Sequence, residues 1–332
     1  MPYVPGLIDF HSHYYDAAWY VSHTLPVPKG LTHAWPVLTD LAAQLAAMDA
    51  AGIDAKVLSA PAGVLVEPGQ PLSHSLMMRI NDRFAELIAA YPERLLALAT
   101  IDAFQGEAAA QEVERAVQTL GLQGICVDCA QRDRYLDEPE ARPAMVAAAA
   151  LGVPVFVHPI SPVGLTERLA RLGHTGILLA RGTEHAASVL ALLRSGMFDE
   201  LPDLKMVVPM IGAATFLFAG IAGQEYERED GWGGSSPRVT RQRLYVDTMG
   251  FDPAAIRFAL DLLGVEHVML GSDWPIMPIM PRQRVEEILT SLNLTEAHKA
   301  AILGGNALRL VTQRASPTSQ SGGGRIGVDT QA

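Results

Sequence analysis

Short apolar runs alternate with longer amphipathic stretches along most of this chain. The apolar runs have strand length, and the longer stretches repeat apolar positions with the period of a helix. The predicted strands are Gly6–Phe10, Ala55–Ser59, Leu95–Ile101, Gly124–Cys129, Val153–Val157, Lys205–Val208, Leu244–Thr248 and His267–Gly271. The predicted helices are Asp40–Ala51, Ser75–Ala90, Glu107–Leu120, Arg142–Leu151, Glu184–Ser195, Pro253–Leu263 and Arg282–Ser291. This alternation is typical of βα units around a parallel sheet.

Eight strands alternating with helices fit either a closed (β/α)₈ TIM barrel or an open doubly wound sheet. A nucleotide-binding open sheet needs a Gly-rich phosphate loop after its first strand, and the sequence has neither common form of that loop. Polar residues end several of the apolar strands, which favours the barrel. We therefore expect an α/β TIM-barrel domain over residues 1–312 and a flexible tail over 313–332, where Ser and Gly replace the periodic pattern.

Composition narrows the classes of function. The 332 residues are 49% hydrophobic and 18% charged, as in a compact globular protein. A net charge of -11 argues against nucleic acid or an anionic membrane surface as a partner. No apolar run approaches the roughly 20 residues that span a bilayer, and the first residues lack a secretory pattern, so we expect a cytoplasmic enzyme.

The two cysteines, Cys126 and Cys129, have the spacing of a redox pair or of half a zinc site. They lie in a predicted strand whose alternation sends them to opposite faces, and no second such pair is present. We therefore predict that both are structural.

Four polar side chains stand at the carboxyl ends of apolar strands. His11 and His13 follow the first strand, His158 follows the fifth, and Asp273 follows the eighth. In a closed barrel the first and eighth strands are neighbours and the fifth lies across the mouth, so the four groups can converge. Three imidazoles and one carboxylate suit a single divalent ion, Zn²⁺ before Mn²⁺ or Fe²⁺.

The sequence resembles the amidohydrolase superfamily, in the branch typified by aminocarboxymuconate semialdehyde decarboxylase and γ-resorcylate decarboxylase. The resemblance runs through nearly the whole ordered chain. It is carried by the segments Asp9–His13, Ala51–Asp54, Tyr91–Arg94, Val155–Pro159, Leu201–Lys205, Gly271–Pro275 and Leu303–Ala307. It implies a mononuclear site, with the same four residues at the family's ligand positions.

One segment departs from that family pattern. After the sixth strand the family usually has a histidine that serves as general acid and base, and Met210 stands there in this chain. A thioether cannot carry a proton at neutral pH. Either another base acts, or the substrate binds the metal directly, or activity has been lost. His185 is the best local substitute, and an apolar wall around Met210 would suit a different substrate.

Several residues are candidates for binding the substrate. The long loop Tyr14–Pro36 is rich in aromatic residues, including Trp35, and such loops often form lids, although ordinary packing explains them too. Trp274 beside the Asp273 ligand could stack on a planar substrate. Asp128 and Asp247 end the fourth and seventh strands and are each either pocket residues or structural hydrogen-bond partners. A substrate carboxylate would need Lys29, Arg181 or an arginine from another subunit.

The resemblance implies non-oxidative decarboxylation of a small, planar, unsaturated or aromatic acid, with Asp273 and His158 as the catalytic residues. The same ligands also suit a hydrolase that uses metal-activated water on a lactone, amide or imide. A metal-binding homologue without turnover is the third reading, because of Met210. We also expect a homodimer, from the resemblance and from the mean hydropathy of +0.18.

Overall fold

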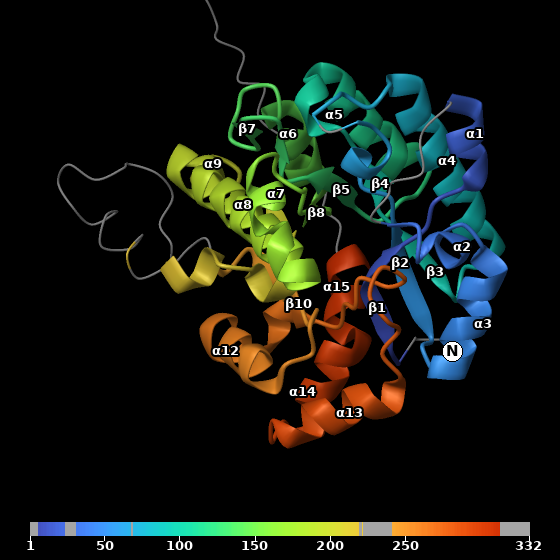
Figure 1. Cartoon of the computed structure of the whole chain (residues 1–332), viewed down its shortest axis with the longest axis vertical. Coiled ribbons are helices and arrows are strands. Elements are labelled where there is room, and N and C mark those ends of the chain that lie inside the picture. Colours follow the sequence, from blue (N-terminus) through green and yellow to red (C-terminus); the bar gives the residue numbers. More distant parts are fainter. Residues whose placement is uncertain (1–5, 24–30, 68, 219–220, 222–240, 313–332) are drawn as a thin grey trace, which may run out of the picture.

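A computed structural model describes residues 6–23, 31–67, 69–218, 221 and 241–312 (Figure 1). The tail predicted over 313–332, and Lys29, lie outside these residues. Within the described part, no helix is long and apolar enough to cross a membrane.

The strands are parallel and follow the order of the sequence around a ring. One sheet has the order β1-β2-β3 and the other has the order β11-β10-β9-β8-β5-β4. The members are β1 (Ile8–His13), β2 (Ala55–Ser59), β3 (Leu95–Ala97), β4 (Ala99–Thr100), β5 (Ile125–Asp128), β8 (Pro154–His158), β9 (Lys205–Val208), β10 (Leu244–Asp247) and β11 (Val268–Met269). The sequence therefore located every strand of the ring, with small errors at the ends.

Main-chain hydrogen bonds close both seams between the two sheets. β3 and β4 are one extended segment interrupted at Leu98, so the first sheet continues directly into the second. At the other seam, Phe10 N donates to Leu270 O over 2.9 Å and Asp273 N donates to His11 O over 2.8 Å. The predicted (β/α)₈ barrel is confirmed, and its closure makes the ends of β1 and β11 neighbours.

Helices follow the strands and cover the outside of the ring (Figure 1). They are α1 (Ala17–His23), α2 (Trp35–Leu38), α3 (Leu41–Ala51), α4 (His74–Ala90), α5 (Glu107–Glu114), α6 (Arg142–Leu151), α7 (Leu165–Leu169), α8 (Gly173–Ser195), α9 (Met197–Glu200), α12 (Pro253–Leu263), α13 (Arg282–Ser291), α14 (Glu296–Ala300) and α15 (Asn306–Thr312). Asp40 and Ser73 accept hydrogen bonds from the first turns of α3 and α4, as N-cap residues do.

Helix α8 differs from its prediction, because it begins at Gly173 and not at Glu184. Three glycines, Gly173, Gly176 and Gly182, lie in its first half and lower the helix propensity of that segment. Tertiary packing overrides this cost. His185 therefore lies in the interior of a long helix and not at its start.

Two apolar clusters divide the core. The inner one fills the ring of strands and is formed mainly by Ile8, Phe10, Ala55, Val57, Leu98, Cys126, Phe156, Val207 and Met269. The outer cluster lies between strands and helices and includes Cys129. Both cysteines are buried and free, each in a different cluster, which agrees with the predicted opposite faces and structural role.

Lys56 is an exception within the outer layer. Its neighbours in β2, Ala55 and Val57, face the inner cluster, so Lys56 points outward, where it is 1% exposed. Its ammonium group donates to Gln44 Oε1 and lies 4.9 Å from the Trp274 ring centroid. Burial lowers the pKa of Lys56 to about 7, and the charge of Asp9 offsets only part of that effect.

We predict that Lys56→Met changes the pH dependence of stability. Between pH 7 and the ordinary lysine range, the unfolded chain binds a proton at Lys56 that the folded chain lacks, so raising the pH favours the fold. The free energy of unfolding of the wild type, minus that of the variant, should rise by roughly 2 to 3 kcal/mol from pH 7 to pH 9. Denaturant titrations measure it, and a constant difference would show that Lys56 stays protonated in the fold.

Candidate metal centre and substrate cavity

A register shift in β1 turns two histidines toward the barrel mouth. Ile8 and Phe10 face the inner cluster, so regular alternation would continue with Ser12 and turn His11 and His13 away. The pairing of β1 with β2 is irregular between Asp9 and Ser12. Such a bulge re-aims the side chains that follow it.

The four predicted ligands come together at this end of the barrel. One ligand atom each from His11, His13, His158 and Asp273 can be chosen so that all lie within 4.8 Å of one another, and all four residues are buried. His13 Nε2 lies 3.0 Å and His11 Nε2 3.4 Å from Asp273 Oδ1. His11 Nε2 is buried without a hydrogen-bond partner among the described residues, as expected of an atom that binds a metal.

The outer nitrogens of two histidines are held by neighbouring strands. Asp247 Oδ2 lies 2.6 Å from His11 Nδ1, and Ser59 Oγ lies 2.9 Å from His13 Nδ1. A partner on Nδ1 fixes ring orientation and leaves Nε2 for the metal. Asp247, one of the two carboxylates considered from the sequence, therefore positions His11. Gly271 permits this packing, because a Cβ there would lie 2.6 Å from Asp247 Cβ and 2.8 Å from His11 Cβ.

The electrostatics suit a cation in the cluster. Burial and neighbouring positive groups hold the pKa of His158 well below 6.5, and burial also lowers the pKa of His13. Both rings are therefore neutral ligands at pH 7. Burial lowers the pKa of His11 as well, but the Asp247 hydrogen bond and three nearby carboxylates outweigh it and raise that pKa overall. A metal ion bound at His11 would balance the negative charge of these carboxylates in place of the proton on the ring.

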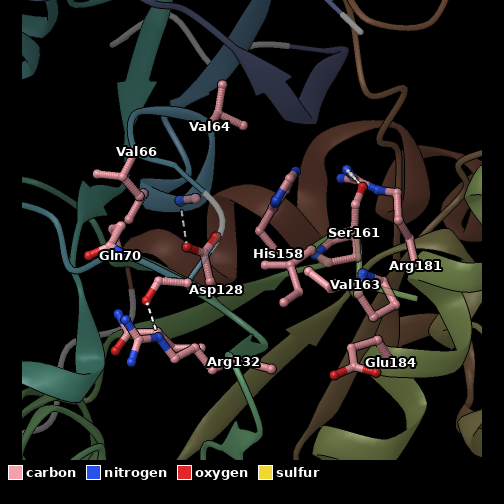
Figure 2. Close-up of a pocket in the computed structure, with 18 of the residues that line it drawn as sticks. Val64, Val66, Gln70, Asp128, Arg132, His158, Ser161, Val163, Arg181 and Glu184 are labelled. Atoms are coloured by element: carbon pink, nitrogen blue, oxygen red, sulfur yellow. Dashed lines mark hydrogen bonds between the residues drawn. The ribbon is translucent and has the colours of Figure 1, made fainter. Parts of the chain in front are cut away.

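A cavity of about 960 Å³ opens beside His158, and its volume suits a small-molecule substrate (Figure 2). Its apolar wall includes Val64, Val66, Ile160, Val163 and Leu165. Its polar residues include Gln70, Asp102, Asp128, Gln131, Arg132, Asp133, Arg181 and Glu184.

Asp128 is the predicted substrate residue that lines this cavity. Its strand pairs with β8 so that Asp128 lies opposite His158. Oδ2 accepts a hydrogen bond from Gly63 N over 2.6 Å, whereas Oδ1 is buried without a partner in the described chain. Burial raises the pKa of Asp128 to about 7, against the Gly63 hydrogen bond, which lowers it. Asp128 is therefore placed to exchange hydrogen bonds with a substrate.

The aromatic side chains in the described part of the first loop pack in the core or, for Trp35, against it, and they do not line this cavity. Trp35 stacks on Tyr15 and meets Tyr20 edge to face, at centroid distances of 6.4 and 4.5 Å. Trp274 is buried beside Lys56. The reading of Trp35 and Trp274 as substrate contacts is thus not supported for this cavity. Leu31 is the residue that the described part of this loop contributes to its lining.

His185 and Met210 are also absent from the cavity lining. His185 is fully buried, and neither ring nitrogen has a hydrogen-bond partner among the described residues. Burial, with the charge of Arg181, lowers its pKa to about 3, which makes it a poor proton carrier at neutral pH. Met210 Cε packs close to Gly182 of α8, because a Cβ added at Gly182 would lie 3.6 Å from it.

Most of the cavity wall was not predicted from the sequence. The segment between β2 and α4 supplies Val64 and Val66, and the hairpin of β6 (Ala130–Gln131) and β7 (Arg134–Tyr135) supplies Gln131 and Arg132. These residues belong to no sequence motif. Only their place in the loops that follow barrel strands could have indicated that they line the substrate cavity. Arg181 was one of three options for a substrate carboxylate, and it lines the cavity.

Comparison with known proteins identifies the family. A model of the amidohydrolase family matches residues 8–312, which is most of the chain. The chain belongs to the amidohydrolase family. This match confirms the resemblance to the amidohydrolase family that the sequence motifs indicated.

The chain is similar to characterised decarboxylases. It is 30% identical to a gamma-resorcylate decarboxylase of Rhodococcus jostii over 293 residues, covering 80% of this chain and 86% of that protein. It is 28% identical over 242 residues to a 2-amino-3-carboxymuconate-6-semialdehyde decarboxylase of Dictyostelium discoideum, covering 71% of this chain and 66% of that protein.

A solved structure supports the fold. The 5-carboxyvanillate decarboxylase of Novosphingobium aromaticivorans, crystallised with manganese and 4-hydroxy-3-methoxy-5-nitrobenzoic acid, superposes with a TM-score of 0.78 at 22% identity. The match covers 92% of this chain and 96% of that one.

We predict a graded loss of metal in two variants. In Asp247→Asn the amide donates to His11 Nδ1, which moves the ring proton to Nε2 and blocks the ligand atom, so metal affinity should fall by about 10–100-fold. His158→Ala removes a ligand outright and should abolish metal retention. Competitive chelator titration measures both. The matched control, Asp261→Asn on the exposed face of α12, should bind metal like the wild type. Wild-type affinity in Asp247→Asn would refute the positioning role.

Proposed function

We propose that this protein is a metal-dependent carboxy-lyase that removes CO₂ from a small planar aromatic or unsaturated acid. The observation that carries the proposal is the buried cluster of three histidines and Asp273 beside a cavity of substrate size, in a chain related to decarboxylases. The hydrolase and the inactive homologue are the alternatives, and no contact among the described residues favours either.

The donor set fits a single divalent ion, because His11 Nε2 is an orphaned buried atom and two of the three histidines are neutral. We propose His11, His13, His158 and Asp273 as its ligands. The sequence favoured zinc. The manganese in the related crystal structure supports Mn²⁺ at least as well, and an N₃O set accepts zinc, manganese or iron. When bound, the ion would withdraw electron density from a coordinated substrate oxygen.

The protein must also move a proton. In the net reaction the carbon–carboxylate bond breaks, CO₂ leaves, and a proton takes the vacated position on the substrate carbon. We propose that Asp273 carries this proton. Burial raises the pKa of Asp273, but the His13 hydrogen bond and the nearby charges of His11 and Arg181 lower it overall, so the group is ionised and can accept a substrate hydroxyl proton. His158 acts beside it as ligand and cavity wall.

Release of CO₂ tests the proposal. Purified protein loaded with Mn²⁺ or Zn²⁺ should release one CO₂ per product from at least one member of a panel of hydroxybenzoates and muconate semialdehydes. Asp273→Ala should release none. Turnover confined to esters, lactones or amides, with labelled solvent oxygen in the product, would identify the hydrolase. Tight binding without turnover, in protein of verified metal content, would identify the inactive homologue.

Met210→His should leave the native turnover unchanged or slower. Met210 Cε lies near Gly182 of α8, outside the cavity lining, so a histidine there would add a polar group to an apolar contact. Steady-state kinetics on the native substrate decide the outcome. A gain of the ~10²–10⁴-fold that general acid and base catalysis supplies would show that the wild type is impaired.

We also propose a cytoplasmic homodimer without nucleic-acid or membrane partners, as the charge and composition suggest. Exposed apolar side chains at the start of α8 and along the 3-10 turn Thr215–Phe218 support a subunit contact, because exposed apolar surface on soluble proteins often marks interfaces. Leu172 precedes α8, Leu179 lies on it, Leu217 and Phe218 lie on the turn, and Ile221 follows the turn.

A further inference from the structure

Arg181 is a cation in the cavity with almost no protein partner. It stands on α8, and its side chain lines the cavity together with His158 and Asp128. Within the described part of the chain its one hydrogen bond is long, 3.5 Å from Nη1 to Ser161 Oγ. Among the described residues, no carboxylate lies within 4.0 Å of its guanidinium group. The other arginine of the lining, Arg132, donates to Gly69 O over 3.0 Å.

Two of the carboxylates that line the cavity, Asp102 and Asp128, have main-chain partners. Asp102 accepts hydrogen bonds from Leu72 N and Phe104 N, and Asp128 accepts one from Gly63 N. A half-buried guanidinium that lacks an ion pair is a favourable site for an anion, because its five donors match a carboxylate in two parallel hydrogen bonds.

Arg181 lies on the same cavity as His158 of the candidate metal centre. Its charge acts on His158, on Asp273 and on Asp128, which surround the reaction site. Figure 2 shows His158 between Asp128 on one side and Arg181 with Ser161 on the other. A planar substrate beside the metal would therefore present one edge toward Arg181.

We propose that Arg181 binds a second carboxylate of the substrate, one that stays on the product, so that the preferred substrates are aromatic or unsaturated dicarboxylic acids. This inference rests on the proposed decarboxylation and names its substrate class. It also makes Arg181 a specificity-determining residue.

The chemistry of decarboxylation decides which carboxylate meets the arginine. The departing group loses its negative charge as CO₂ forms, so a cation beside it would stabilise the ground state more than the transition state and slow the reaction. A retained carboxylate keeps its charge throughout, and its pairing with Arg181 fixes the orientation of the substrate. Val64 and Val66, on the side of the cavity away from Arg181 (Figure 2), offer the departing group an apolar surface.

Binding of unreactive analogues tests the arginine directly. In 2-nitrophenol and its ring-carboxylated derivatives, the hydroxynitrobenzoates, the nitro group takes the place of the departing carboxylate. Calorimetry with the manganese-loaded full chain should show the best hydroxynitrobenzoate binding about 10–100-fold more tightly than 2-nitrophenol. Arg181→Gln should remove this difference and leave the affinity for 2-nitrophenol unchanged. Arg181→Lys should retain part of it.

Turnover provides the second measurement. Each hydroxybenzoate is paired with its derivative that bears one further carboxylate, and kcat/KM is compared within pairs. The dicarboxylate should be preferred by the wild type and by the control Arg168→Gln, which removes the same charge from an exposed position on α7. Arg181→Gln should lose the preference, mainly through KM. Circular dichroism and metal content verify that each variant is folded and loaded.

The outcomes separate this inference from the proposed function. Equal affinity of the wild type for both classes of analogue, or an undiminished difference in Arg181→Gln, would overturn the role of Arg181 even if CO₂ is released. An Arg181-dependent preference for hydroxynitrobenzoates without any CO₂ release would support the anion subsite and reject decarboxylation. Should Arg181→Gln not fold, an undiminished preference in Arg181→Lys would count against the proposal.

Discussion

Closure of the strand ring is the constraint on which the metal centre depends. The hydrogen bonds from Phe10 to Leu270 and from Asp273 to His11 make β1 and β11 neighbours, although about 260 residues separate them in the chain. The bulge in β1 then turns His11 and His13 to the side on which His158 ends β8. Without the closure, Asp273 would have no fixed relation to the histidines. The backbone of Asp273 itself has a φ of 64°, which is unfavourable for a residue with a side chain. The surrounding hydrogen bonds hold it in this conformation.

The second constraint is that buried ligands need partners of their own. Asp247 connects three elements, because it accepts hydrogen bonds from Met210 N and Met249 N while it holds His11 Nδ1. Asp9 is similarly bound to Ser272, beside the Asp273 ligand. A metal would complete this network, since it replaces a proton on His11 and neutralises part of the surplus negative charge. Metal binding and local stability are therefore coupled through the same carboxylates.

The barrel and the convergence of the four candidate ligands could be predicted from the sequence, because strand periodicity and polar strand ends are local signals. The cavity wall was less predictable. Aromatic residues such as Trp35 and Trp274 suggest a lid, yet the half-buried Trp35 stacks on Tyr15 and Trp274 is buried in the core. The first half of α8 contains three glycines, whose low helix propensity argues against a helix there. Arg181 lies within that half. Side chains that depend on tertiary packing leave no periodic trace in the sequence.

The end of β9 shows why a missing histidine need not mean a lost function. Met210, Ile211 and Ala213 have positive φ angles of 59°, 56° and 49°, which are unfavourable for residues with a side chain, most of all for the β-branched Ile211. Such strain costs roughly 1–3 kcal/mol per residue and persists only where the surroundings enforce it. Asp247 provides one such restraint through Met210 N, and the same carboxylate orients His11. The backbone at Met210 thus supports the metal centre whatever the side chain is. Selection on this segment can therefore preserve its conformation, while in our proposal Asp273 carries the proton and Arg181 orients the substrate.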